Sequence, residues 1–98
     1  MDPNSYLPNY NMGVLLCKDK AMMEQSLAYF NRALECAHEA GEFIYEMNVL
    51  NTISLLNEAS GSLEAALEAQ EMALKIDPGN TKIMKKIKEL NEMHNNRL

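Results

Sequence analysis

The chain has 98 residues, of which 47% are hydrophobic, and a formal net charge of −5. A chain of this length forms one domain, and its apolar content is too high for intrinsic disorder. No apolar run approaches the roughly 18 residues of a membrane-spanning helix, and the polar N-terminus does not resemble a signal peptide, so we expect no membrane association.

The charge is distributed unevenly along the chain. Residues 1–77 contain four basic and twelve acidic side chains, whereas residues 78–98 contain five basic and two acidic ones. The acidic part would repel nucleic acid, so we expect no nucleic-acid partner. The basic end is either a solvated helix face or a surface that docks on something acidic.

The two cysteines, Cys17 and Cys36, do not form a Cys-x-x-Cys motif. Two cysteines without such a motif favour two buried, reduced thiols, and a disulfide or a metal site is the alternative. We therefore predict an intracellular, cytoplasmic protein.

Hydrophobic periodicity predicts five helices and no strands. The first helix begins near Ser5, a suitable N-cap, and ends near Lys18. Pro8 is compatible with its first turn, where backbone N–H groups have no partner within the helix. Its apolar stripe consists of Met12, Leu15 and Leu16.

The second predicted helix covers residues 21–40 and has one apolar face. Apolar residues recur along it at alternating steps of four and three: Met23, Leu27, Phe30, Leu34 and Ala37. This spacing is typical of one side of an α-helix. Gly41 provides the stop, because glycine readily adopts the left-handed conformation that ends many helices.

The third predicted helix, residues 42–59, is apolar on two faces. One stripe contains Phe43, Met47 and Leu50, and the other contains Val49, Ile53 and Leu56. A helix with two apolar stripes contacts neighbours on two sides, so we place it in the middle of the fold. Gly61 ends it.

The fourth and fifth helices are predicted at residues 63–76 and 80–95. Ser62 is the expected N-cap of the fourth, and Pro78 prevents its continuation. A thin face of small side chains allows close packing of the fourth helix: Ala66, Ala69 and Ala73. The fifth helix has one narrow apolar stripe and a polar back, which is typical of an end cap; the stripe is Ile83, Ile87, Leu90 and Met93.

The third and fourth helices together resemble the tetratricopeptide repeat, a helix–turn–helix unit of about 34 residues. The matching positions are Leu50, Ile53, Ser54, Gly61, Ala66, Ala73 and Pro78. In such a unit, small residues let the paired helices cross closely, large ones fill the space between repeats, and glycine forms the turn. Asn57 and Gln70 depart from the pattern, because the family usually has aromatic residues there.

The first two helices match the same pattern less closely. Ser26, Phe30 and Ala33 fit the second-helix positions with a shift of one residue. The junction between the second and third helices is longer than in the standard unit. In this respect the chain resembles the repeats of about 40 residues in kinesin light chains and in Leu-Gly-Asn repeat scaffolds.

The resemblance implies an all-α helix–turn–helix array, an α-solenoid. We expect a single domain over residues 2–98, with repeat one at 5–40, repeat two at 42–78 and a capping helix at 80–95. The opening Asp2-Pro3-Asn4 resembles the closing signal of a preceding repeat. About three repeats are usually needed for stability, so we expect either a fragment of a longer array or self-association through the first helix pair.

No motif for nucleotide binding, metalloprotease chemistry or serine hydrolysis occurs in the sequence. His38 and His94 lie on different predicted helices, and the neighbours of His38 at two-residue spacing do not share its helix face. We therefore expect no enzyme, no catalytic residue, no cofactor and no metal.

The repeat resemblance implies a groove lined by the first helix of each pair, where a partner peptide binds. By register, the partner-binding residues are Tyr10, Val14, Asn48, Asn51, Leu55 and Glu58. The longer-repeat families often have an asparagine at the position of Asn51, whose amide can bind a peptide backbone as donor and acceptor. The alternative is that Asn51 bonds within its helix or to water.

The carboxylate clamp that some repeats of this family use for acidic tails is absent. Its positions hold Tyr10, Val14, Thr52, Asn80 and Met84. The acidic balance of the chain also disfavours an acidic ligand, so we expect a neutral, apolar or basic peptide or protein partner. The predicted function is a non-catalytic scaffold or adaptor. The alternatives are a homo-oligomerisation module or a helical bundle with a fortuitous resemblance.

Overall fold

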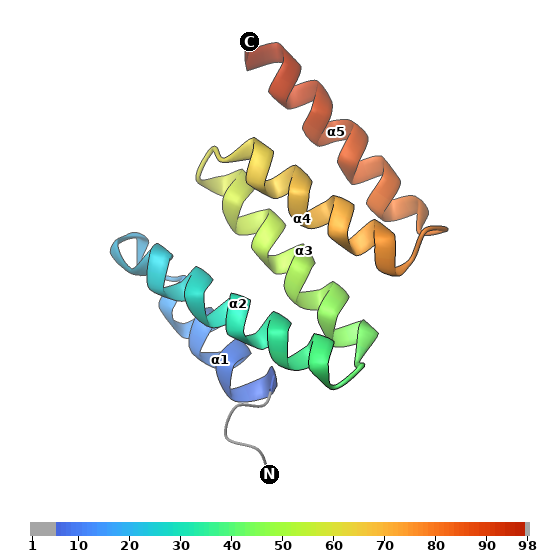
Figure 1. The fold of residues 1–98 in the computed structure, drawn as a ribbon. Helices are drawn as coiled ribbons and strands as arrows, with labels where there is room; N and C mark the ends of the chain where they lie inside the picture. Colours follow the sequence, from blue (N-terminus) through green and yellow to red (C-terminus); the bar gives the residue numbers. More distant parts are fainter. Residues whose placement is uncertain (1–5, 98) are drawn as a thin grey trace. The chain divides into compact units, whose positions relative to one another are not determined.

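The computed structural model describes the backbone of residues 6–97 and contains five α-helices (Figure 1). They are α1 (Tyr6–Leu16), α2 (Met23–Glu39), α3 (Phe43–Ala59), α4 (Leu63–Ile76) and α5 (Thr81–Arg97), with a 3₁₀ turn, η1 (Lys20–Met22), before α2. No strand occurs among the described residues. The prediction of an all-helical chain is confirmed, and the helix order agrees with it. The proposed N-cap Ser5 lies outside the described residues.

The chain divides into two compact units, residues 1–49 and 50–98, and the boundary falls inside α3. Each unit contains one helical hairpin, and each is described by itself. In the first unit, Asp19 starts η1 by accepting the Ala21 N–H on its carboxylate. The chain then reverses, so that α2 packs along α1.

Small groups bring α1 and α2 together in the first unit. The buried side of α2 consists of Ser26, Phe30, Ala33 and Ala37, which recur at alternating steps of four and three residues. The Ser26 hydroxyl donates to the Gly13 carbonyl at 2.7 Å. Phe30 and Ala37 are buried as predicted, whereas Met23, Leu27 and Leu34 are only half-buried. The buried side of α2 is therefore turned about the helix axis, away from the predicted stripe and towards the small residues.

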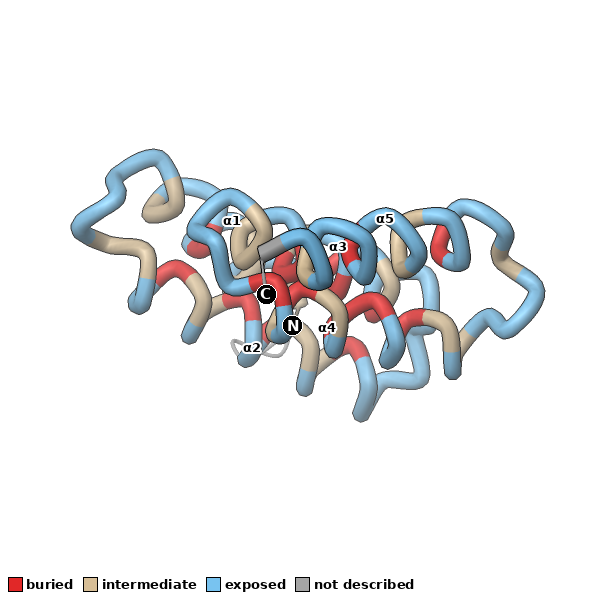
Figure 2. Tube along the Cα trace, turned by 90° about the horizontal axis from the view of Figure 1, so that it is seen from above, coloured by how far each residue is buried: buried red, intermediate tan, exposed pale blue. Residues whose placement is uncertain are grey.

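The second unit repeats this arrangement with α3 and α4. The predicted small face of α4 is confirmed, because Ala66, Ala69 and Ala73 are all buried. The Ser54 hydroxyl of α3 donates to the Ala66 carbonyl at 3.0 Å. Figure 2 shows that the buried positions of α2 and of α4 follow one side of each helix.

Helix α5 covers α4 in the second unit. Leu90 of α5 packs with Leu63 and Ala66 of α4 in a buried cluster, and Leu67 lies against it. The Asn80 side chain caps α5 by accepting the Ile83 N–H at 3.1 Å. Asn80 thus has a structural role in this unit.

Several predicted core or capping positions are wrong. Phe43 is 61% exposed, and Met12, Leu15 and Met93 are also exposed. Ser62 occupies the N-cap position of α4, but its side chain makes no capping hydrogen bond. In α1 the apolar residues are spread around the helix, and only Gly13 is buried. The apolar pattern of α1 therefore did not indicate which side of the helix packs against its neighbour.

Candidate functional site

Four aromatic rings form a connected cluster in the first unit. Tyr6 of α1 stacks on Tyr45 of α3 with ring centroids 4.6 Å apart and planes 4° apart. Tyr6 also contacts Tyr10 at 5.2 Å, and Tyr10 meets Phe30 edge-on at 5.4 Å. Such offset and edge contacts favour a defined geometry, so the cluster positions α1 against α2 and the start of α3.

Tyr6 connects two of the predicted binding residues. Its side chain hydrogen-bonds to Asn48 and its ring contacts Tyr10. Partial burial, and next the neighbouring Tyr10, raise the pKa of the Tyr6 phenol above its ordinary value of 10.0. The phenol is therefore protonated at neutral pH, and the hydrogen bond orients the exposed Asn48.

The first-unit residues predicted to bind a partner have different surroundings. Tyr10 is half-buried between Tyr6 and Phe30, so much of its ring belongs to the core. Val14 and Asn48 are exposed. Within this unit the structure brings Tyr10 and Asn48 together through Tyr6.

The remaining predicted residues lie further along α3, in the second unit. Asn51 and Leu55 are exposed and stand one helical turn apart. The Asn51 Oδ1 accepts a hydrogen bond from Gln70 Nε2 of α4 at 3.3 Å. The side chain of Gln70 is buried, and this hydrogen bond orients the Asn51 amide.

Glu58 forms an ion pair that the sequence analysis did not identify. Its Oε1 lies 2.7 Å from Lys86 Nζ of α5, and both side chains are about three-quarters buried. A carboxylate that is already paired with a lysine contributes little affinity for a basic ligand. Glu58 therefore contributes to the second unit's packing as well as to the surface along α3.

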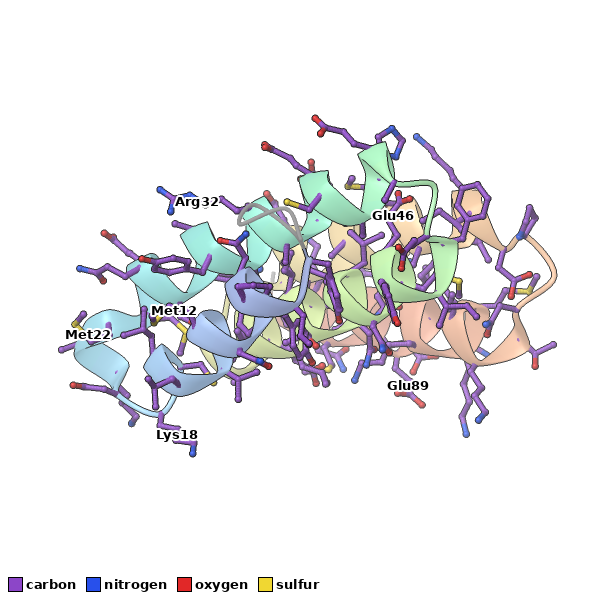
Figure 3. The ribbon with its side chains drawn as sticks, turned by 90° about the horizontal axis from the view of Figure 1, so that it is seen from below. Met12, Lys18, Met22, Arg32, Glu46 and Glu89 are labelled. Atoms are coloured by element: carbon purple, nitrogen blue, oxygen red, sulfur yellow. The ribbon has the colours of Figure 1, made fainter. Side chains whose placement is uncertain are left out.

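A hydrogen-bond contact between two side chains joins α2 to α3 in the first unit. His38 Nδ1 lies 3.1 Å from Glu46 Oε2, and Glu46 is buried while His38 is exposed. Among the described residues, Glu46 Oε1 is buried without a hydrogen-bond partner. Figure 3 shows Glu46 near the start of α3, next to the end of α2. Sequence reasoning missed this pair because its members approach only across the Gly41 turn.

Two surface pockets adjoin the helix turns. One of about 430 Å³ is lined by residues 41–45 in the first unit. The other, of about 590 Å³, lies in the second unit and is lined by residues 61–65, Glu68 and His94.

No group of three possible metal ligands occurs among the described residues. Both cysteines are reduced thiols, but they are half-buried rather than buried as predicted. No helix in the described part of the chain is both long and apolar enough to cross a membrane.

Comparisons with protein-family models, with curated proteins and with solved structures find no significant match to this chain.

Proposed function

We propose that this chain is a non-catalytic protein-interaction module of the tetratricopeptide type, which binds a partner peptide along α3. The observation that carries the proposal is the exposed row formed by Asn51 and Leu55 on the part of this helix that lies in the second unit. The Asn51 amide is fixed in orientation by its hydrogen bond from Gln70. A side chain that is already fixed in one conformation loses less conformational entropy when a partner binds, which favours a role of this amide in binding.

Three features support the repeat assignment. Ser54, Ala66 and Ala73 are buried, where the repeat pattern requires small side chains. Gly61 has a positive φ of 83° in the turn between α3 and α4, a conformation that favours glycine. The first unit has a hairpin of the same kind, with Ser26 bonded to Gly13.

The chemistry of the row indicates the class of partner. The Asn51 Oδ1 is engaged by Gln70, so its Nδ2 group is directed to donate to a carbonyl oxygen, such as one of a peptide backbone. Leu55 provides apolar contact beside it. Because Lys86 neutralises Glu58, we propose a peptide with a neutral or apolar centre, to which basic flanks are acceptable.

The test is a selection of peptides from a random display library against the folded chain, followed by affinity measurements. We expect Asn51→Ala and Leu55→Ser to weaken the selected peptides by roughly tenfold or more. Binding is measured where each variant is fully folded, because Asn51→Ala also removes the acceptor of the buried Gln70 amide. Met72→Ser is the matched control, because Met72 is 43% exposed on α4 and Leu55 is 49% exposed on α3. Equal binding by all three variants would overturn the proposal.

A further inference from the structure

Three consecutive large apolar side chains are exposed where α2 turns into α3. Phe43, Ile44 and Tyr45 line the pocket of about 430 Å³ together with Gly41 and Glu42. We call these five residues the turn patch. Tyr45 is held by its stacking on Tyr6, so one wall of the pocket is formed before anything binds. Large exposed apolar clusters of this kind mark interaction surfaces.

The turn patch and its surroundings carry acidic side chains. Glu39 and Glu42 are exposed on either side of Gly41. The nearby His38 is in contact with Glu46, whose second carboxylate oxygen has no hydrogen-bond partner among the described residues. An apolar pocket with this charge fits an occupant that combines an apolar side chain with basic neighbours.

The chain has such a segment on α5 in its second unit. Met84 is exposed, Lys85 follows it, and Lys88 lies one turn further along the helix; both lysines are exposed. We call these three residues the helix patch. Lys86 differs from them, because it is paired with Glu58 inside the second unit.

We propose that the turn patch of one molecule binds the helix patch of a second copy. Met84 enters the pocket between Phe43 and Tyr45, where its thioether contacts aromatic rings, and Lys85 and Lys88 face Glu39 and Glu42. A flexible methionine suits a preformed pocket with aromatic walls.

The contact is heterologous, because the two patches are different surfaces. The two end molecules of an open complex therefore each keep one patch available, and assembly continues as a chain or closes as a ring. The two patches include neither Asn51 nor Leu55, so this interface extends beyond the proposed peptide binding and does not depend on it. It also differs from self-association through the first helix pair, which the sequence suggested.

The test begins with molar mass by light scattering over a concentration series. At about 0.01 M salt we expect the average mass to rise with concentration above the 11.1 kDa of one chain. At about 1 M salt, where charges are screened beyond about 3 Å, the dissociation constant should rise by roughly tenfold or more. A monomer at every concentration in low salt would overturn the proposal.

Point variants locate the interface. Ile44→Ser should weaken association by roughly tenfold. Leu15→Ser is the matched control on α1, because Leu15 is 62% exposed and Ile44 is 78% exposed. An equal effect of both changes would indicate unspecific apolar association and would overturn the proposal.

Charge reversal gives the sharpest result. The double variants Glu39→Lys/Glu42→Lys and Lys85→Glu/Lys88→Glu should each remain monomeric alone, because each brings like charges together. An equimolar mixture should associate again, since every contact between the two variants then joins opposite charges. If the mixture stays monomeric while the wild type associates, the two patches are not partners. The selected peptides should bind all these variants alike, which separates this test from that of the proposed function.

Discussion

The ring of Phe30 occupies the space where a side chain at position 13 would begin. A Cβ placed on Gly13 would lie 2.8 Å from the ring, well inside van der Waals contact. Phe30 is completely buried on α2, and Gly13 is the buried position of α1. The first helical hairpin thus depends on the absence of a side chain at one point.

Gly13→Ala should therefore destabilise the chain. Alanine is favoured over glycine in a helix by about 1 kcal/mol, but overpacking against a buried ring costs about 1–3 kcal/mol, so we expect a net loss. Chemical unfolding measures the difference. Gly79→Ala is the control, because nothing lies within 4 Å of a Cβ there and its stability should hardly change. A stabilised Gly13→Ala would show that α1 does not pack on Phe30.

The crossing of α3 and α4 should be equally intolerant of larger side chains. Ala66 and Ala73 are buried, so Ala66→Leu or Ala73→Leu should lower the free energy of unfolding by roughly 1–3 kcal/mol. Ala28→Leu on the exposed side of α2 should be close to neutral. Unchanged thermal unfolding of both α4 variants would mean that the assigned register is wrong.

The pair Glu58–Lys86 should couple α3 to α5 energetically. We expect Glu58→Gln and Lys86→Met each to lower the free energy of unfolding by about 1 kcal/mol, because the 2.7 Å contact is largely shielded from water. The double variant should lose less than the two single changes together. Full additivity in this double-mutant cycle would show that the two side chains do not interact.

The raised pKa of Tyr6 predicts a loss of stability in alkali. The fold favours the protonated phenol, so this contribution is complete below the ordinary pKa of 10.0 and is lost as pH rises from there through the folded-state pKa. An absorbance titration of the folded chain should show one tyrosine that ionises at a higher pH than the tyrosines of the unfolded chain. Tyr6→Phe should remove this ionisation at high pH. If it persists in the variant, the raised pKa does not belong to Tyr6.

Small residues allowed the sequence to predict much of the hairpin packing. Ser26, Ala33, Ser54 and Ala66 stand at pattern positions and are buried, because only small groups fit where helices cross closely. Phe43 shows the limit of this reasoning. It begins α3, where fewer neighbours surround a side chain, so its helical spacing did not ensure burial.

The polar contacts of the candidate site were harder to predict. Position 70 stood out as polar in the sequence, but nothing in the periodicity identified Asn51 as its partner. The pairing of Glu58 with Lys86 depends on how α5 packs in the second unit. Such contacts follow from three-dimensional placement, which a one-dimensional pattern does not contain.

The most direct test of the proposed function is an amide chemical-shift titration of the chain with a selected peptide. We expect the largest shifts at Asn51 and Leu55 on α3, and little change at the buried amides of α2. Saturable binding with shifts concentrated elsewhere, or no saturable shift at any peptide concentration, would contradict the proposed function.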